Sequence, residues 1–424
     1  MLVGVLTAPA QRGFGGPGRI PGGYLFARYP FDQWAAETAK PQIRWSVQTN
    51  SPHLSPHQRL LQQIDIAIGG SELRSRSDSR QLIAFVRLED AAGKRYQTAN
   101  MTRIGTNRKQ IQEVDYHFPA FIIPGDYTIE LAICDSHTLE HSFVRRQLHI
   151  APMNPDVLAG AWKALPSVEF LPVNGIPDSW FLPQIPERLS LPIRTARPTH
   201  IDLLVNTAPA APGTISELRR NMENVVPSLK VLMGLDPAQG SVGLSIVDLA
   251  RRAFTYEEPD IRATPPSEWA RRNLSKFRTA FAETHTTVVD IKTLEGQRRT
   301  LNYLSGEVTR LLGPRNPTDA MRHVVIVLSA PFYFDNQEKP PLPDLPADPA
   351  RRLFYIGYSP LAMLQTEGVA GPSTMRVPLY RSSDDIEHTL KPLGARVFRV
   401  SRPEEFRKAL GAILSDISGT EPAR

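Results

Sequence analysis

One pentapeptide in the sequence has the residue types and spacing of a known catalytic motif. His137-Thr138-Leu139-Glu140-His141 matches H-x-x-E-H, in which two histidines hold zinc and a glutamate assists catalysis. That chemistry requires the three side chains on one helix, whereas residues 129–133 and 143–150 alternate as strands do. We therefore predict a hairpin loop with solvated histidines. A metal-dependent hydrolase using residues 137–141, next to Cys134 and Asp135, is the less favoured alternative function.

Other catalytic signals are weak. No Gly-x-Ser-x-Gly elbow occurs, which is the setting that would favour Ser/His/Asp catalysis. The segment Gly240-Ser241-Val242-Gly243 precedes an expected strand instead of following one, so we interpret it as a turn and not as a phosphate loop. Cys134 is the only cysteine, which excludes an internal disulfide and a thiolate zinc cluster. The sequence predicts no enzyme activity and no cofactor.

Polar residues follow two apolar segments. Residues 201–205 lead into Asn206-Thr207-Ala208-Pro209-Ala210, and residues 324–328 lead into Ser329-Ala330-Pro331. Fully apolar strands are typical of a parallel sheet that is buried on both faces, and such sheets bind ligands beyond the carboxyl ends of their strands. Magnesium requires about six oxygen ligands with carboxylates among them, and these loops offer mainly neutral oxygens.

The first of these strands and its exit loop resemble the opening of von Willebrand factor type A domains. That family carries an Asp-x-Ser-x-Ser metal motif there, and the aligned positions are Asn206, Ala208 and Ala210. Ala330 stands where the family's fourth strand is followed by an acidic residue. The resemblance covers about residues 198–417 and implies a degenerate site without a metal ion. The chain as a whole resembles an uncharacterised bacterial secreted family that carries related type A domains.

Three aromatic residues follow the second apolar segment. Phe332-Tyr333-Phe334 either pack on the sheet edge or form an exposed anchor for a protein partner, since aromatic residues are favoured at interfaces. We take them, together with Thr207 and Ser329, as the candidate partner-contact residues.

The first third of the chain has short segments with period-2 alternation, such as residues 42–47, 64–68 and 82–88, which predict strands. Residues 85–98 read as strand, turn and strand, with Gly93 in the turn. Pro124-Gly125-Asp126-Tyr127 resembles the tyrosine corner of immunoglobulin-like and fibronectin-like domains, in which the tyrosine hydroxyl binds nearby backbone.

These patterns predict a multidomain fold class, an N-terminal all-β sandwich plus a C-terminal α/β doubly wound domain that is Rossmann-like and type A-like. The expected boundaries are a signal remnant and flexible lead-in at 1–23, the sandwich at 24–152, a proline-rich linker at 153–197, the α/β domain at 198–417 and a tail at 418–424.

Composition narrows the classes of partner. The net charge is +6, and the lysine and arginine residues are spread along the chain in pairs without forming a dense basic tract. We therefore predict no nucleic-acid partner. No segment has the roughly 18 apolar residues of a membrane span. The apolar start, residues 2–6, followed by Ala8-Pro9-Ala10, is typical of the end of a signal peptide and predicts an extracytoplasmic location.

The expected function is protein interaction or scaffolding with an unidentified protein partner, and the alternative is a structural spacer in a cell-envelope assembly.

Overall fold

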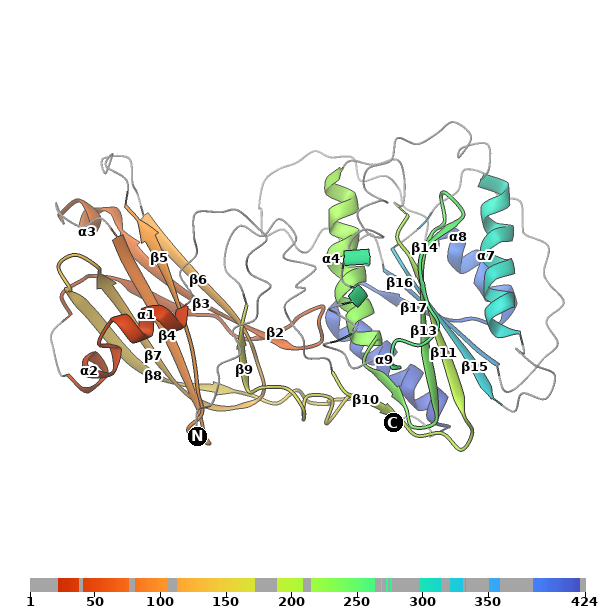
Figure 1. The fold of residues 1–424 in the computed structure, drawn as a ribbon, viewed down its shortest axis with the longest axis horizontal. Helices are drawn as coiled ribbons and strands as arrows, with labels where there is room; N and C mark the ends of the chain where they lie inside the picture. Colours follow the sequence, from red (N-terminus) through yellow and green to blue (C-terminus); the bar gives the residue numbers. More distant parts are fainter. Residues whose placement is uncertain are drawn as a thin grey trace. The chain divides into compact units, whose positions relative to one another are not determined.

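The computed structural model describes residues 22–37, 41–75, 81–104, 113–171, 189–208, 215–263, 268, 272–273, 275–276, 297–313, 321–330, 332, 351–358 and 384–419. The chain separates into two compact units (Figure 1). Unit 1 comprises Met1–Ser55, Arg59–Asp156 and Pro166–Pro177, and unit 2 comprises Pro56–Gln58, Val157–Leu165 and Asp178–Arg424.

Unit 1 is built from two antiparallel sheets. One has the order β1-β3-β6-β9, with β2 paired to β3, and the other has the order β5-β4-β7-β8. The Tyr116 hydroxyl on β6 donates to the Leu82 carbonyl on β4 at 2.9 Å, which ties the two sheets together. The strands are β1 Ser46–Thr49, β2 His53–Leu54, β3 Leu60–Gly69, β4 Gln81–Asp90, β5 Arg95–Arg103, β6 Glu113–Ile122, β7 Gly125–Asp135, β8 His141–Ile150 and β9 Val168–Phe170.

Two local features of unit 1 agree with the sequence patterns. The β4–β5 hairpin turns at Gly93, whose φ of 77° lies in the left-handed region that glycine adopts without steric cost. The Tyr127 hydroxyl donates to the Ile123 carbonyl at 2.8 Å and to the Ser167 carbonyl at 3.3 Å. The tyrosine therefore holds the entry of β7 against backbone that precedes β9.

The beginning of unit 1 is helical, which corrects the expectation of strands from residue 24 onward. Helices α1 (Gly22–Arg28) and α2 (Phe31–Ala36) form, with residue 37, a segment that we call the N-terminal strap. The apolar residues at 25, 29, 31 and 34 recur at intervals of two to four, and they pack on the sheet of β4 and β7 because that face is itself apolar. A further short helix, α3 (Gly70–Ser75), follows β3.

Arg87 fixes the strap from the sheet side. Its guanidinium lies 4.5 Å from the centre of the Phe31 ring, and Nη1 is 2.6 Å from Oδ1 of Asp32 and 3.4 Å from Oε2 of Glu130. Arg145 holds the other oxygen of Glu130 at 2.6 Å. The buried Arg87 charge is therefore balanced by two carboxylates, which offsets the cost of removing it from water.

Unit 2 contains a six-stranded mixed sheet and a small two-stranded sheet. The strand order is β14-β13-β11-β15-β16-β17, in which β14 is antiparallel to β13 and the other neighbours are parallel. The strands are β10 Leu191–Ile193, β11 Thr199–Asn206, β12 Leu235–Pro237, β13 Gly240–Asp248, β14 Ala253–Glu258, β15 Arg322–Ser329, β16 Arg351–Tyr358 and β17 Arg396–Val400. The helices are α4 Ile215–Leu232, α7 Gln297–Leu312, α8 Asp385–Leu390, the 3-10 helix η5 Lys391–Leu393 and α9 Pro403–Ser418.

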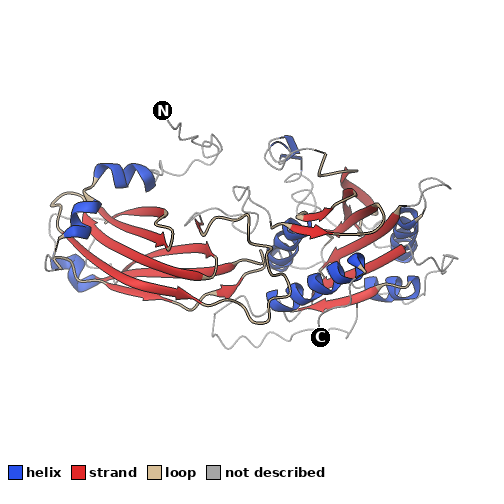
Figure 2. Ribbon diagram, turned by 90° about the horizontal axis from the view of Figure 1, so that it is seen from below, coloured by secondary structure: helices blue, strands red, loops and turns tan. Residues whose placement is uncertain are grey.

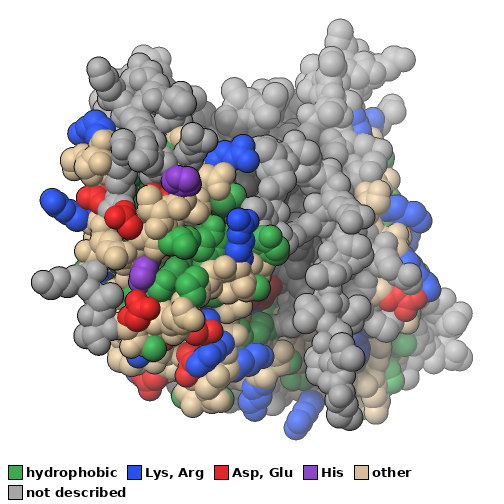
Figure 3. Space-filling model, turned by 60° about the vertical axis from the view of Figure 1, so that its left-hand side comes forward, with side chains coloured by type: hydrophobic (Ala, Val, Ile, Leu, Met, Phe, Trp, Pro, Cys, Tyr) green, Lys and Arg blue, Asp and Glu red, His purple; other side chains and the backbone are tan. Residues whose placement is uncertain are grey.

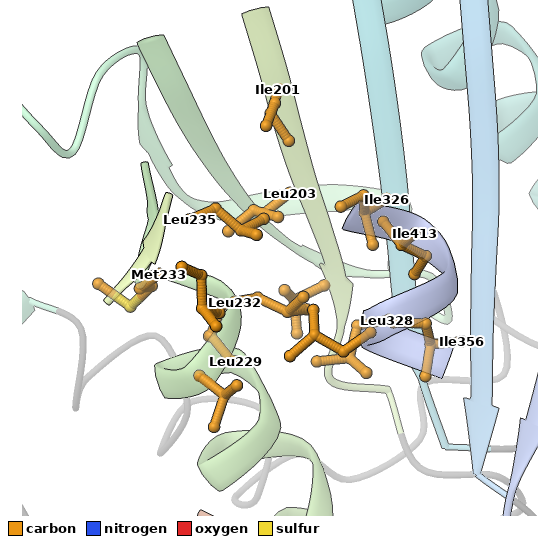
Figure 4. Packing of buried hydrophobic residues seen from close by; sticks show 14 of the residues in the cluster. Ile201, Leu203, Leu229, Leu232, Met233, Leu235, Ile326, Leu328, Ile356 and Ile413 are labelled. Atoms are coloured by element: carbon orange, nitrogen blue, oxygen red, sulfur yellow. The ribbon is translucent and has the colours of Figure 1, made fainter. Parts of the chain in front are cut away.

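Helices bury both faces of the large sheet. Leu229 and Leu232 of α4 and Ile413 of α9 pack with Leu203 and Ile326 on one face (Figure 4). On the other face, α7 and α8 contribute an apolar cluster with the remaining side chains of β11, β15 and β16. The central strands β11 and β15 therefore bury both of their faces, which explains why residues 201–205 and 324–328 are apolar without alternation.

The predicted fold class is wrong. The described structure is mostly β, with 45% strand against 26% helix, and antiparallel sheets are prominent in it (Figure 2). In unit 2, β13 and β14 form an antiparallel pair. No clear Rossmann-like α/β domain is evident, and β14 follows its sheet neighbour β13 without an intervening helix.

The expected linker also contributes to the fold. Val168–Phe170 forms β9, which pairs with β6, and Leu191–Ile193 forms β10, which pairs with β12. Trp162 lies against the core of unit 2, and its indole Nε1 donates to the Gln58 carbonyl at 2.9 Å. Residues 172–188 lie outside the described part of the chain.

Candidate functional site

The strands β11, β13 and β15 end side by side, which brings the predicted polar positions together. Asn206 is the register partner of Val247 on β13 and of Ser329 on β15. We call the residues at these ends, Asn206, Thr207, Asp248 and Ser329, the strand-exit edge.

Hydrogen bonds to neighbouring groups occupy the Asn206 side chain. Its Nδ2 donates to Oγ of Ser329 at 3.0 Å, and its Oδ1 accepts from the backbone N–H groups of Ala208 at 3.0 Å and Leu249 at 3.3 Å. A cation placed between Asn206 and Ser329 would face the amide NH₂ group, which is a donor and cannot act as a ligand. The side chain therefore braces three loop segments.

The two described alanines of the degenerate motif belong to the core. Ala208 and Ala330 are each 2% exposed and pack in the apolar clusters on opposite faces of the sheet. A methyl group supplies no oxygen to a metal ion, and each of these methyls instead fills space beside buried strands. Ala210 lies outside the described residues.

The candidate partner-contact residues that the structure describes are buried. Thr207 and Ser329 are inaccessible, and Phe332 is 5% exposed within the cluster that contains α7 and α8. The Phe332 carbonyl accepts from the Asp385 N–H at 3.0 Å, which holds this segment against the start of α8. These three side chains therefore present no exposed surface in this structure, and their contact with a partner stays a prediction. Tyr333 and Phe334 lie outside the described residues.

Sequence reasoning missed a buried carboxylate at this edge. Asp248 ends β13, is 3% exposed and accepts from the Arg251 N–H at 3.1 Å. Burial raises the pKa of Asp248, against the lowering effects of the Arg251 N–H and guanidinium. The signal in the sequence was an acidic residue closing an apolar strand.

A second buried carboxylate, Asp384, caps α8. Its Oδ1 accepts from the Glu387 N–H at 2.7 Å, and its Oδ2 accepts from the Tyr355 hydroxyl at 2.5 Å. Burial raises the pKa of Asp384 to about 6, although both hydrogen bonds act to lower it. Glu387 one turn later is held by Arg399 at 2.7 and 2.8 Å, so the carboxylates around α8 have defined structural partners.

The H-x-x-E-H residues lie at the β7–β8 connection, as a hairpin loop. We call residues 136–140 the hairpin tip. Oδ1 of the buried Asp135 accepts from the N–H groups of His137 at 2.9 Å and Thr138 at 3.4 Å, and the Leu139 N–H donates to the Asp135 carbonyl at 3.0 Å. These bonds fix the backbone of the tip.

The two histidines of the motif differ in environment. His137 is exposed, whereas His141 stacks on Trp34 of the strap, with ring centres 4.7 Å apart and planes at 20°. Nε2 of His141 lies 3.5 Å from Oε2 of Glu37, and Nδ1 lies 3.3 Å from the Leu139 carbonyl. The expectation that both histidines are solvated is therefore wrong for His141. Within the described residues, no three His, Cys, Asp or Glu side chains are arranged to hold a metal ion.

Leu139 is the unusual residue of the tip. It has a φ of 61°, in the left-handed region that side chains with a Cβ rarely adopt, and it is 56% exposed. Figure 3 brings the left-hand side of Figure 1 forward and shows hydrophobic side chains gathered beside histidine and basic side chains.

Comparisons with known proteins do not assign a family. No protein family and no curated protein matches the sequence. The structural matches include structural genomics target SoR45, at 15% identity and a TM-score of 0.18 over 28% of this chain and 92% of that chain. They also include two structures of a glycosyl hydrolase family 2 member from Bacteroides cellulosilyticus, at 9 and 10% identity and TM-scores of 0.18 and 0.19, each over 67% of this chain. This chain covers 36 and 34% of those two chains, and at such TM-scores none of the three informs the fold or the function.

No helix among the described residues combines the length and the apolar character that crossing a membrane requires.

Proposed function

We propose that the chain is a protein-interaction or scaffolding protein and that its hairpin tip inserts Leu139 into an apolar pocket of a protein partner. The observation that supports this proposal is the exposed, left-handed Leu139 on a turn whose backbone is held by Asp135. We place the proposed contact surface at the hairpin tip and not at the strand-exit edge, because the described partner-contact candidates at that edge are buried.

The energetics of the tip favour a binding role. A left-handed conformation at a residue with a Cβ costs about 1 kcal/mol, and a glycine at position 139 would avoid that cost. The leucine also leaves apolar area in water that a pocket would bury, with a gain of up to about 2 kcal/mol. Because the turn is already ordered by its hydrogen bonds, binding loses little conformational entropy there.

The proposal needs no divalent ion. Asn206 uses its amide oxygen for two backbone N–H groups, and Ala208 and Ala330 serve the core, so the strand-exit edge contributes to the stability of unit 2. Binding through the tip should therefore persist in a chelating buffer.

The experiment is a pull-down from an extract of the source cells with the full chain as bait. Leu139→Ala tests the tip, and Tyr24→Ala, which removes a 54% exposed aromatic side chain elsewhere on unit 1, is the matched control. We expect a partner retained by the wild type and by the control and lost with Leu139→Ala. An identical set of bound proteins for all three baits would reject the tip and leave the spacer function.

The extracytoplasmic location is part of this proposal. Fractionation of the source cells tests it, with recovery from the envelope or medium expected and recovery only from the cytoplasm as the contrary result.

A further inference from the structure

A serine, a histidine and an aspartate meet at the amino ends of two parallel strands of unit 2. The register pairs His200 of β11 with Ser241 of β13, and Asp202 with Gly243. Because alternate residues of a strand share a face, His200, Asp202 and Ser241 all lie on the same face of the sheet. Three residues that are far apart in the sequence are therefore placed together by strand pairing alone.

The three side chains form one hydrogen-bonded relay. Nδ1 of His200 is 2.6 Å from Oγ of Ser241, and Nε2 of His200 is 3.0 Å from Oδ1 of Asp202. An ionised Asp202 can only accept, so it takes the proton of Nε2 and leaves the lone pair of Nδ1 facing the serine hydroxyl. The serine then donates to an imidazole that an aspartate orients, which is the order of roles in a catalytic triad with the two ring nitrogens exchanged.

Glycine at position 243 makes room for the relay. A Cβ at Gly243 would lie 2.7 Å from Oδ1 of Asp202 and 3.5 Å from Nε2 of His200, so a side chain there would displace the carboxylate from the imidazole. Gly240, which precedes the serine, has a φ of 148° and a Cβ position 1.8 Å from the Thr199 carbonyl oxygen. The Gly-Ser-Val-Gly segment thus builds the geometry around Ser241.

Ser241 is the most exposed of the three residues, as a nucleophile requires. His200 and Asp202 are 1% and 6% exposed, whereas Ser241 is only partly buried. The base and its orienting carboxylate are shielded from water, which strengthens their interaction.

We propose that Ser241 is a nucleophile for small carboxylic esters, activated by His200 and oriented through Asp202. Oγ of Ser241 attacks the ester carbonyl carbon while its proton passes to Nδ1 of His200. The C–O bond to the alcohol then breaks, and the alcohol leaves with that proton. Water attacks the acyl-serine, gives a proton to Nδ1, and the serine recovers it as the acid departs, so that the net reaction is ester plus water to acid plus alcohol. This activity goes beyond the proposed binding function and does not depend on it.

The test is covalent labelling of the full chain with a fluorophosphonate probe, read by intact mass and peptide mapping. We expect one adduct, on Ser241, that is absent from Ser241→Ala and unchanged in Ser245→Ala, which removes another serine from the same strand. His200→Gln should slow labelling by about 100-fold or more, since general-base assistance contributes roughly that much. Thermal unfolding of each variant confirms that it is folded.

A wild-type chain that stays unlabelled, or an adduct that persists in Ser241→Ala, would overturn the proposal. Leu139→Ala should label as the wild type does, so loss of partner binding and loss of the nucleophile are separate outcomes.

Discussion

Asp384→Asn should stabilise the protein at neutral pH and have little effect in acid. The carboxyl group accepts from the Glu387 N–H through Oδ1 and from the Tyr355 hydroxyl through Oδ2. Asparagine keeps one oxygen for the Glu387 N–H, and its NH₂ group, in the place of Oδ2, can donate to the Tyr355 hydroxyl oxygen. It removes the negative charge that burial disfavours at this position. The substitution therefore isolates the cost of ionising a carboxyl group that is 7% exposed.

The size of the effect follows from the two pKa values of this group. Burial raises the pKa of Asp384 from 3.8 to about 6 in the folded protein. A carboxyl group with a raised folded pKa contributes stability that is fully present below the unfolded pKa and is lost as the pH rises through the folded pKa. Since one pKa unit corresponds to about 1.4 kcal/mol, the wild type loses up to about 3 kcal/mol from this group between pH 4 and pH 7.5.

Urea unfolding followed by circular dichroism at pH 4 and pH 7.5 measures the difference. We expect Asp384→Asn to be more stable than the wild type by about 1–3 kcal/mol at pH 7.5 and nearly equal to it at pH 4. Glu404→Gln, at an exposed acid in the first turn of α9, is the control and should show no comparable gain. A variant that is less stable at pH 7.5, by the same amount at both pH values, would refute a raised pKa at Asp384.

Three further predictions concern other buried contacts. Tyr127→Phe should cost unit 1 about 1–2 kcal/mol in the free energy of urea unfolding, because it removes the two backbone hydrogen bonds of the corner; an unchanged midpoint would deny the corner a structural role. Cys134 is fully buried under the strap, and burial raises its pKa to about 12, so Ellman's reagent should not modify the native thiol. Phe31→Ala should loosen the strap and make the thiol reactive. Equal reactivity of the wild type and Phe31→Ala would argue that the strap does not protect the thiol. Asn206→Ala should lower the stability of unit 2 by about 3 kcal/mol, with Asn302→Ala on the exposed face of α7 near zero; equal effects would contradict the bracing role of Asn206.

The sequence patterns predicted individual strands better than they predicted how the strands pair into a fold. Residues 201–205 and 324–328 were expected as buried strands and lie in β11 and β15, because a run of apolar residues long enough for a strand is a local signal. Pairing depends on distant residues: nothing in residues 253–258 indicates that β14 runs antiparallel to β13. The strap was missed because two helices of seven and six residues carry too few turns to show a clear period, and their stability comes from packing on the sheet.

The candidate sites show the same division between local and long-range information. The loop at residues 136–140 could be predicted from its flanking strands, but the left-handed backbone of Leu139 and the stacking of His141 on Trp34 required the structure. The exposure of residues 332–334 was undecidable from sequence, and helices α7 and α8 bury Phe332. The relay of Ser241, His200 and Asp202 arises only from the register of β11 against β13.

The most direct test of the interaction function is the retention of a partner in a chelating buffer. Pull-downs with the wild type, Leu139→Ala and Tyr24→Ala in the presence of EDTA should show a partner bound to the first and third baits and absent from the second. A partner that is released by EDTA, or that binds Leu139→Ala as well as the wild type, would contradict metal-independent recognition by the hairpin tip.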